Sequence, residues 1–224
     1  MREPRAAPAS LDRDWPVSNF DALLNGYHRF RHADWEQHRD SWYELAKGQH
    51  PKIMVIACSD SRVDPATVFQ TVPGEIFVLR NVANLVPPDD QSNRLNGVSA
   101  ALEYAVTQLG VTDIVVMGHH ECGGAAAALT HKFDHAGLGE GGYIDHWLHL
   151  VSATRDAVVA EHGDDATTEL EQALVRLSLA NLRTFSWIAE REAAGTLTLH
   201  GAWFSIADGR VYTLDGTNGV FAAI

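Results

Sequence analysis

Three short apolar runs, separated by stretches of helical character, constrain the fold of this sequence more than any other feature. They are residues 53–57 (IMVIA), 76–79 (IFVL) and 114–117 (IVVM), and such continuous apolar runs are typical of strands buried on both faces. Between the second and third runs, apolar residues recur at helical spacing over residues 98–109, and Gly110 is a helix stop signal. Strand, helix and strand in this order predict a right-handed crossover in a parallel sheet.

The C-terminal part continues the pattern. Residues 170–195 indicate one long amphipathic helix, and Thr168 with Glu171 fits a capping box at its start. Residues 197–206 indicate a strand, and the Asp-Gly pair at 208–209 predicts a turn into the return strand of a hairpin. The predicted fold class is therefore α/β, with a mostly parallel central β-sheet flanked by helices, an N-terminal helical arm and a C-terminal strand or hairpin.

The N-terminal arm, residues 20–46, has helical spacing and many aromatic residues. They are Phe20, Tyr27, Phe30, Trp35, Trp42 and Tyr43. Aromatic side chains outside a core need something to bury them. Docking on the chain's own domain and wrapping around a second subunit both satisfy this need.

Length and charge exclude several classes of function. The 224 residues suit one α/β domain, and no apolar run approaches the length that spans a bilayer. A formal net charge of −12 argues against a nucleic-acid partner, which requires clustered cations. The first residues lack the apolar stretch of a secretory signal, so we expect a cytoplasmic protein that begins near Met1. In that compartment a disulfide between the two cysteines is disfavoured.

Reactive side chains follow the first and third apolar runs. Cys58-Ser-Asp-Ser-Arg62 comes after the first, and His119-His-Glu-Cys122 comes after the third. Ligands of open parallel sheets bind beyond the carboxyl ends of the strands, where these segments fall. Two thiols and one imidazole suit a borderline-soft divalent ion, and zinc is the default for such a set.

The fourth position on that ion has two interpretations. No third cysteine exists, so the position is either open or held by a carboxylate. Asp60 is the natural carboxylate, but Arg62 competes for it through a bidentate pair. Asp60 on the metal closes the site, whereas Asp60 paired with Arg62 leaves the metal open to water.

These motifs resemble those of the β-class carbonic anhydrases, in particular the plant-like branch. The resemblance rests on CSDSR at 58–62 and HxxCGG at 119–124, with PGE and RNVAN between them. It runs from about residue 49 to 124 and continues more weakly through SLANLRTF. It implies an enzyme, a carbonic anhydrase of the lyase class, with one zinc per chain.

The resemblance also implies roles for individual residues. It assigns Cys58, His119 and Cys122 as zinc ligands and Asp60 with Arg62 as a catalytic dyad, with Asp60 as a fourth ligand in a closed state. The implied substrate pocket consists of Gln49 as amide donor, Phe77, Val82 and Tyr104 as wall, and Gly123 as backbone contact. Without the resemblance, core packing would be the better explanation for the three wall residues.

The implied reaction is the reversible hydration of carbon dioxide to bicarbonate and a proton by zinc-bound hydroxide. In our hypothesis Asp60, held by Arg62, accepts a hydrogen bond from that hydroxide and orients it. The resemblance further implies a homodimer or homotetramer. An arm of residues 1–48 would dock on a partner subunit, and a catalytic domain of residues 49–224 would receive pocket residues from its neighbour.

Two rival functions are compatible with parts of the pattern. One keeps the fold and metal but takes carbon disulfide or carbonyl sulfide as substrate. The other is a non-catalytic zinc-binding or redox-sensing module in which Asp60 stays on the metal. The joint presence of Gln49, Arg62 and Tyr104 argues against both. His120 departs from the family pattern, and its role stays open.

Overall fold

The computed structural model describes residues 18–90, 92, 95–163 and 166–224. The chain divides into two compact units, one ending at Gln49 and the other spanning His50–Ile224. The part of the predicted arm before residue 18 lies outside the described residues.

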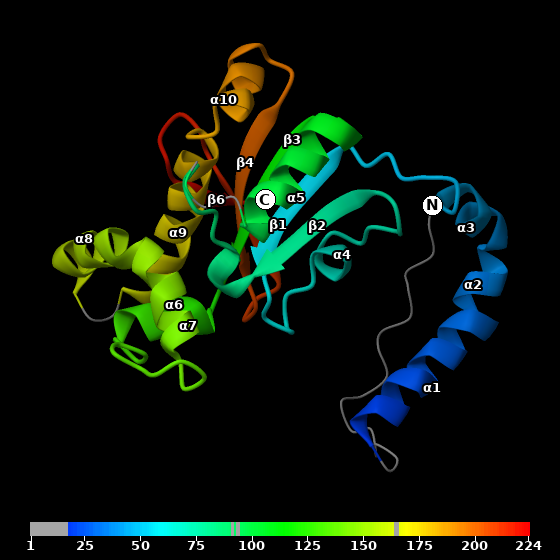
Figure 1. Ribbon diagram of the computed structural model, residues 1–224, viewed down its shortest axis with the longest axis horizontal. Coiled ribbons are helices and arrows are strands. Elements are labelled where there is room, and N and C mark those ends of the chain that lie inside the picture. The colour runs from blue at the N-terminus through cyan, green and yellow to red at the C-terminus, as the bar shows by residue number, and fades with distance from the viewer. Residues whose placement is uncertain (1–17, 91, 93–94, 164–165) are drawn as a thin grey trace. The chain divides into compact units, whose positions relative to one another are not determined.

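The larger unit is built on a six-stranded sheet with the order β2-β1-β3-β4-β5-β6 (Figure 1). The strands are β1 (Ile53–Cys58), β2 (Ile76–Asn81), β3 (Asp113–His119), β4 (Thr198–Ser205), β5 (Arg210–Leu214) and β6 (Phe221–Ala223). Strands β2, β1, β3 and β4 are parallel, and β5 and β6 are antiparallel to their neighbours. The predicted fold class, the three strands and the hairpin are therefore confirmed, and β6 was not predicted. The prediction that residues 76–79 are buried on both faces is wrong, because β2 lies at the edge of the sheet and all its residues are partly exposed.

The helices of this unit cover the sheet and extend beyond it. They are α4 (Pro65–Val68), η1 (Val82–Asn84), α5 (Gly97–Glu103), η2 (Tyr104–Leu109), α6 (Gly123–Leu129), α7 (Gly142–Leu148), η3 (His149–Val151), α8 (Ser152–His162), α9 (Thr167–Leu182) and α10 (Ser186–Ala193). Among the elements that the sequence did not predict, α6, α7 and α8 group beside α9 (Figure 1).

The main core lies between one face of the sheet and the helices α5, α9 and α10. Met54 and Ile56 of β1 and Ile114 of β3 are fully buried there, against Leu102 of α5 and Leu182 of α9. Each such side chain stabilises the fold by about 1.5–3 kcal/mol through its removal from water. The alternate residues of the same strands form a smaller cluster on the opposite face, which explains why the apolar runs are continuous.

The predicted helix of residues 98–109 is confirmed, with a change of winding at its end. Tyr104–Leu109 is π-helical, and Gly110 ends it in the left-handed conformation with φ of 66°. Short π-helical segments often occur at functional sites.

The prediction of one long helix over residues 170–195 is wrong, because the chain breaks between α9 and α10. Phe185 adopts an extended conformation with ψ of 109° and is buried in the core. Thr184 donates its hydroxyl to the carbonyl of Asn181 and accepts the N–H of Asp89. The backbone N–H groups of Thr184 and Phe185 bond to the carbonyls of Asn181 and Leu182, three residues earlier, so α9 ends in a tight turn.

The predicted capping box is also wrong. Helix α9 begins at Thr167 after Ala166, which has no side chain that could cap the helix. Glu171 does not reach back to the helix start but is buried, with 2% of its surface exposed. Its partners lie at the candidate site.

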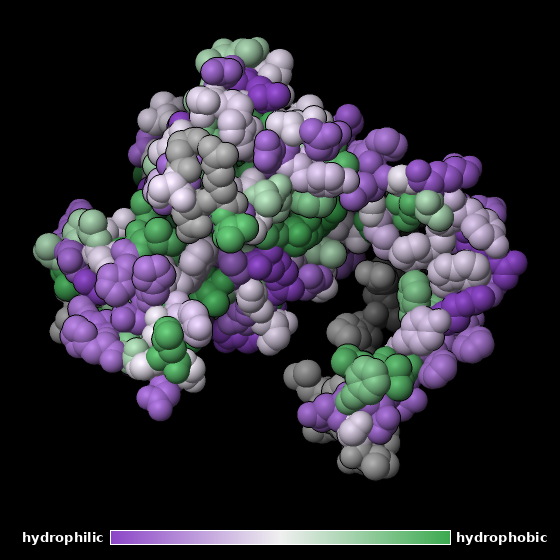
Figure 2. Space-filling view, viewed as in Figure 1, coloured by the Kyte–Doolittle hydropathy of each residue, from purple (hydrophilic) through white to green (hydrophobic). Residues whose placement is uncertain are grey.

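The N-terminal unit contains three helices, α1 (Asn19–His32), α2 (Asp34–Gln37) and α3 (Arg39–Leu45). Part of its aromatic content packs within the unit itself, since Phe30 contacts Trp42 and Trp35 contacts Tyr43. Four apolar side chains of α1 stay exposed at helical spacing: Phe20, Leu23, Leu24 and Tyr27. They form the α1 stripe, which appears as an apolar patch over that helix in Figure 2.

No helix among the described residues is long and apolar enough to cross a membrane.

Candidate active site

The candidate metal site forms where two adjacent parallel strands end. β1 ends at Cys58 and β3 ends at His119, and the two strands pair in register up to Ala57 opposite Met117. The chain then turns through Glu121, whose φ is 57°, and places Cys122 at the start of α6. The sulfur atoms of Cys58 and Cys122 are 4.0 Å apart. The ligand atoms of the two cysteines and His119 all lie within 4.8 Å of one another.

The chemistry of this Cys-His-Cys cluster fits a divalent metal ion. All three residues are buried, and both cysteines are free thiols. The Nδ1 atom of His119 lies 2.9 Å from the carbonyl of His120, which fixes the ring and leaves Nε2 as the metal-binding nitrogen. That buried Nε2 has no hydrogen-bond partner among the described residues, which is costly unless a ligand occupies it.

The three titratable groups of the cluster shift one another's pKa values. The hydrogen bond from Cys122 lowers the pKa of Cys58, while the Cys58 thiolate, together with burial, raises the pKa of Cys122. Burial alone would lower the pKa of His119, but the adjacent Cys58 thiolate and the His120 carbonyl raise it above its ordinary value. A divalent cation relieves the repulsion between two thiolates that otherwise cannot ionise together.

Asp60 is paired with Arg62 in this structure. Its Oδ1 accepts hydrogen bonds from the backbone N–H and Nε of Arg62, both at 2.9 Å, and its Oδ2 accepts one from Nη2 at 2.7 Å. The guanidinium holds the pKa of Asp60 well below its usual range. Oδ2 of Asp60 is 4.0 Å from Nε2 of His119, so the carboxylate borders the cluster. Of the two arrangements weighed for the sequence, this is the one that leaves the metal position open.

Arg62 also connects the two loops of the site. Its Nη2 donates to the backbone carbonyl of Glu121 at 2.9 Å, in the turn that carries Cys122. The guanidinium of Arg62 therefore joins the loop after β1 to the loop after β3.

A second arginine supports the loop after β1. Arg80 of β2 donates from Nε to the carbonyl of Cys58 at 2.9 Å and from Nη2 to the carbonyl of Asp60 at 2.6 Å. Its Nη1 lies 3.4 Å from Oδ1 of Asp64, the N-cap residue of α4. Sequence reasoning noted Arg80 only as part of RNVAN, because its contacts depend on the pairing of β1 with β2.

The comparisons with known proteins agree on one family. The sequence profile described as carbonic anhydrase matches residues 53–211, well over half of the chain. A carbonic anhydrase of Pseudomonas aeruginosa is 39% identical over 206 residues, which cover 90% of this chain and 90% of that protein. A carbonic anhydrase of Synechocystis sp. is 36% identical over 205 residues, which cover 90% of this chain and 73% of that protein.

Solved structures give the class. The β-carbonic anhydrase CcaA matches with a TM-score of 0.84 at 34% identity, over 92% of this chain and 100% of that chain. This chain belongs to the β-class carbonic anhydrases. Tetrameric β-carbonic anhydrases of Sordaria macrospora match with a TM-score of 0.75 at 32% identity, over 91% of this chain and 98% of that chain. Carbonic anhydrases are lyases, so this chain is an enzyme of that class.

Two of the substrate-pocket residues expected for a β-carbonic anhydrase lie beside the cluster. Gly123 directly follows Cys122, is exposed, and has open space where a Cβ would be. Val82 is 40% exposed and approaches α6 at Gly124, where an added Cβ would lie 3.0 Å from Cγ1 of Val82. Gly124 therefore allows the close approach that brings Val82 to the turn of Cys122.

The other two residues expected to form the pocket wall lie elsewhere in the unit. Phe77 pairs with Met54, four residues before Cys58 on β1, so it lies about 13 Å along the strands from the cluster. Tyr104 stacks near Phe77, with ring centroids 6.0 Å apart, and is 46% exposed. Gln49 is exposed and ends the N-terminal unit. The cluster of one chain therefore does not have Phe77 and Tyr104 beside it.

His120, the departure from the family pattern, packs its ring against Trp203 with centroids 6.0 Å apart. Its Nε2 lies 3.7 Å from a carboxylate oxygen of Glu121.

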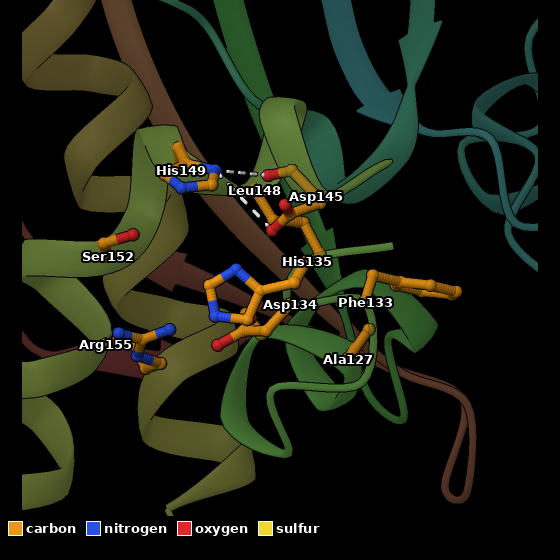
Figure 3. Close-up of a pocket in the computed structure, with 10 residues that line it drawn as sticks. Ala127, Phe133, Asp134, His135, Asp145, Leu148, His149, Ser152 and Arg155 are labelled. Atoms are coloured by element: carbon orange, nitrogen blue, oxygen red, sulfur yellow. Dashed lines mark hydrogen bonds and ion pairs between the residues drawn. The ribbon is translucent and has the colours of Figure 1, made fainter. Parts of the chain in front are cut away.

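A cavity of about 150 Å³ lies away from these residues, between α6, α7 and α8 (Figure 3). Several of its polar side chains are paired: His149 with Asp145, Asp134 with His131, and Arg155 with Asp156. Within the described part of the chain, only the Cys-His-Cys cluster groups three residues that could hold a metal. The cavity contains none of the predicted site residues.

Proposed function

We propose that this enzyme catalyses the reversible hydration of carbon dioxide to bicarbonate and a proton, with one zinc ion per chain held by Cys58, His119 and Cys122. The observation that supports this most is the buried Cys-His-Cys cluster, in which Nε2 of His119 lacks a partner among the described residues. The donor set suits tetrahedral zinc with one open position. A cytoplasmic location remains our prediction from the sequence.

Zinc held by these residues supplies a Lewis acid that makes water a nucleophile at neutral pH. Two thiolates donate more charge than imidazoles would, so the surrounding residues must contribute to activation. Oδ2 of Asp60 would accept a hydrogen bond from the nucleophilic water and orient its lone pair toward carbon dioxide. Arg62 keeps Asp60 ionised and away from the metal position through the bonds described above. Arg80 holds the backbone of the same loop.

We propose that the substrate pocket is completed by a second copy of the chain. Val82 and Gly123 lie beside their own cluster, whereas Phe77 and Tyr104 lie at the other end of β1 and β2. A half-exposed tyrosine on a π-helical segment suits an interface. The tetrameric β-carbonic anhydrases among the structural relatives support an oligomer. In this proposal Gln49, Phe77 and Tyr104 serve the zinc of the partner subunit, as donor and apolar wall.

The same assembly gives the α1 stripe a partner. Four exposed apolar side chains on one helix are unfavourable in water, and a second subunit would bury them. We therefore propose residues 1–48 as an arm that docks on the neighbour and residues 49–224 as the catalytic domain.

Mixing two inactive variants tests the shared site. Cys122→Ser lacks zinc but keeps its wall residues, and Phe77→Ala with Tyr104→Ala keeps zinc but lacks its wall. If the wall serves the partner's zinc, each mixed dimer has one intact site, so coexpression restores about a quarter of wild-type activity under random pairing. Stopped-flow hydration measures this recovery, with each variant alone as the control. If the coexpressed protein is no more active than the mean of the two variants alone, the wall residues serve the zinc of their own subunit.

The function itself is tested by stopped-flow hydration of carbon dioxide by purified protein whose metal content has been measured. We expect rapid hydration and about one zinc per chain. Full zinc occupancy without hydration, from mildly acidic to alkaline pH, would contradict the proposal and favour a closed site or a sulfur-containing substrate.

A further inference from the structure

Glu171 is a buried carboxylate that the proposed reaction does not use. It lies on α9 with 2% of its surface exposed. Its Oε1 accepts the backbone N–H of Cys122 at 2.9 Å, and its Oε2 accepts the indole N–H of Trp203 at 3.1 Å. Burying a carboxylate is costly, so its presence requires an explanation.

The two donors explain why a carboxylate occupies this position. The N–H groups of Cys122 and Trp203 are both buried, and each would be unsatisfied next to an apolar side chain. A carboxylate presents an acceptor oxygen to each of them. A glutamine presents only one oxygen, and its NH2 group must face the other N–H.

The absence of a side chain at Gly118 lets Glu171 reach the turn that carries Cys122. Gly118 precedes His119, and a Cβ there would lie 2.8 Å from Cγ2 of Val175 and 3.4 Å from the carbonyl oxygen of Glu171. The absent side chain therefore lets α9 pack closely over the end of β3. The turn that follows contains Glu121 at a positive φ, a conformation that non-glycine residues adopt only where surrounding contacts hold it.

We propose that Glu171 is a positioning residue of the metal site, which fixes Cys122 in its ligand geometry by accepting the backbone N–H of that cysteine. This inference rests on the proposed zinc site. The second oxygen ties the same carboxylate to Trp203, whose ring packs on His120. Glu171 of α9 therefore contacts Cys122 at one end of the turn directly. At the other end it is connected to His120 through Trp203 of β4.

The test is the zinc affinity of Glu171→Gln, measured by competition with a chromophoric chelator. Residues that hold a metal ligand typically contribute 10- to 100-fold in affinity, so we expect the dissociation constant to rise by about that factor. Glu169→Gln, which removes the same charge from a position of α9 that contacts neither donor, is the matched control and should leave it unchanged. The absorption bands of the cobalt-substituted protein should shift in Glu171→Gln alone, because the cysteine ligand changes its geometry.

A second substitution separates positioning from general stability. When Trp203→Phe is combined with Glu171→Gln, the NH2 group of the introduced glutamine no longer faces an N–H, and its oxygen is free for Cys122. The double variant should therefore bind zinc more tightly than Glu171→Gln alone. Trp203→Phe by itself keeps the bond to Cys122 and should raise the zinc dissociation constant by less than about tenfold, a result that does not require Glu171→Gln to fold.

Three results would overturn the inference. One is a wild-type zinc affinity and cobalt spectrum in Glu171→Gln, whatever its melting temperature. Another is a double variant whose loss of zinc affinity equals the sum of the losses in the two single variants. The third is a Trp203→Phe variant whose zinc dissociation constant rises by more than about tenfold. A wild-type protein that binds no zinc would instead remove the proposed metal site, and this inference with it.

Discussion

Replacing Cys122 by serine is expected to abolish both zinc binding and the hydration of carbon dioxide. A serine hydroxyl does not ionise near neutral pH, so the buried cluster loses one of its two thiolate donors. A catalytic metal contributes several kcal/mol to the stabilisation of the transition state. The rate constant kcat/KM should therefore fall by at least about a thousandfold.

Stopped-flow hydration and metal analysis of the same sample measure this effect. Ala126→Ser adds a hydroxyl at an exposed position of α6 and should leave both quantities at wild-type values. Removal of zinc from the wild-type protein by a chelator should reproduce the loss, and added zinc should reverse it. A Cys122→Ser variant that hydrates carbon dioxide at the wild-type rate would refute the assignment of the ligands.

Replacing Asp60 by asparagine is expected to preserve zinc binding but remove most turnover. Asp60 accepts three hydrogen bonds from Arg62, and an asparagine would direct an NH2 group at the guanidinium. The pair that orients the nucleophile in the proposed reaction is then lost. The loss of one such preorganised group typically lowers kcat by about 10²–10³.

Zinc content and the hydration rate, measured together, separate this role from metal binding. Glu121→Gln removes the same charge from an exposed side chain of the neighbouring turn, and it should retain activity. Full turnover by zinc-loaded Asp60→Asn would show that the dyad does not act in the reaction.

The low pKa of Asp60 also bears on how the stability of the site and the activity of the enzyme depend on pH. Because Arg62 lowers this pKa in the folded protein, the pair stabilises the site above the unfolded pKa of about 3.9. That contribution is lost only as the pH falls further, through the folded pKa. We therefore expect that protonation of Asp60 does not limit the hydration of carbon dioxide near neutral pH, which the pH profile of stopped-flow hydration measures.

The central sheet could be predicted because its signals are local. Strands β1 and β3 are continuous apolar runs, and a strand buried on both faces requires no alternation. The run of β2 gave the strand but not its exposure, because its edge position depends on the order of the strands. The break before α10 could not be predicted, because Phe185 continues the apolar spacing while tertiary packing places it in an extended conformation. Strand β6 and helices α6 to α8 likewise lack strong local patterns.

The cluster of Cys58, His119 and Cys122 could be predicted for a different reason. Cysteine and histidine at the ends of two apolar runs are few and chemically distinctive, and parallel strands bring their carboxyl ends together. The family resemblance then supplied the dyad and the substrate pocket. Glu171 was misinterpreted as a cap, since a glutamate three residues after a threonine at a helix start has a sufficient local explanation.

By itself, the sequence determined the parallel sheet, the family and the residues of the Cys-His-Cys cluster. Only the tertiary structure decided that Asp60 pairs with Arg62, that Arg80 and Glu171 hold the two loops, and that Phe77 and Tyr104 lie away from their own cluster. The physical reason is that strand order, register and the packing of α9 over Gly118 set these distances. Such quantities depend on contacts between segments that are far apart in the chain, which no local pattern records.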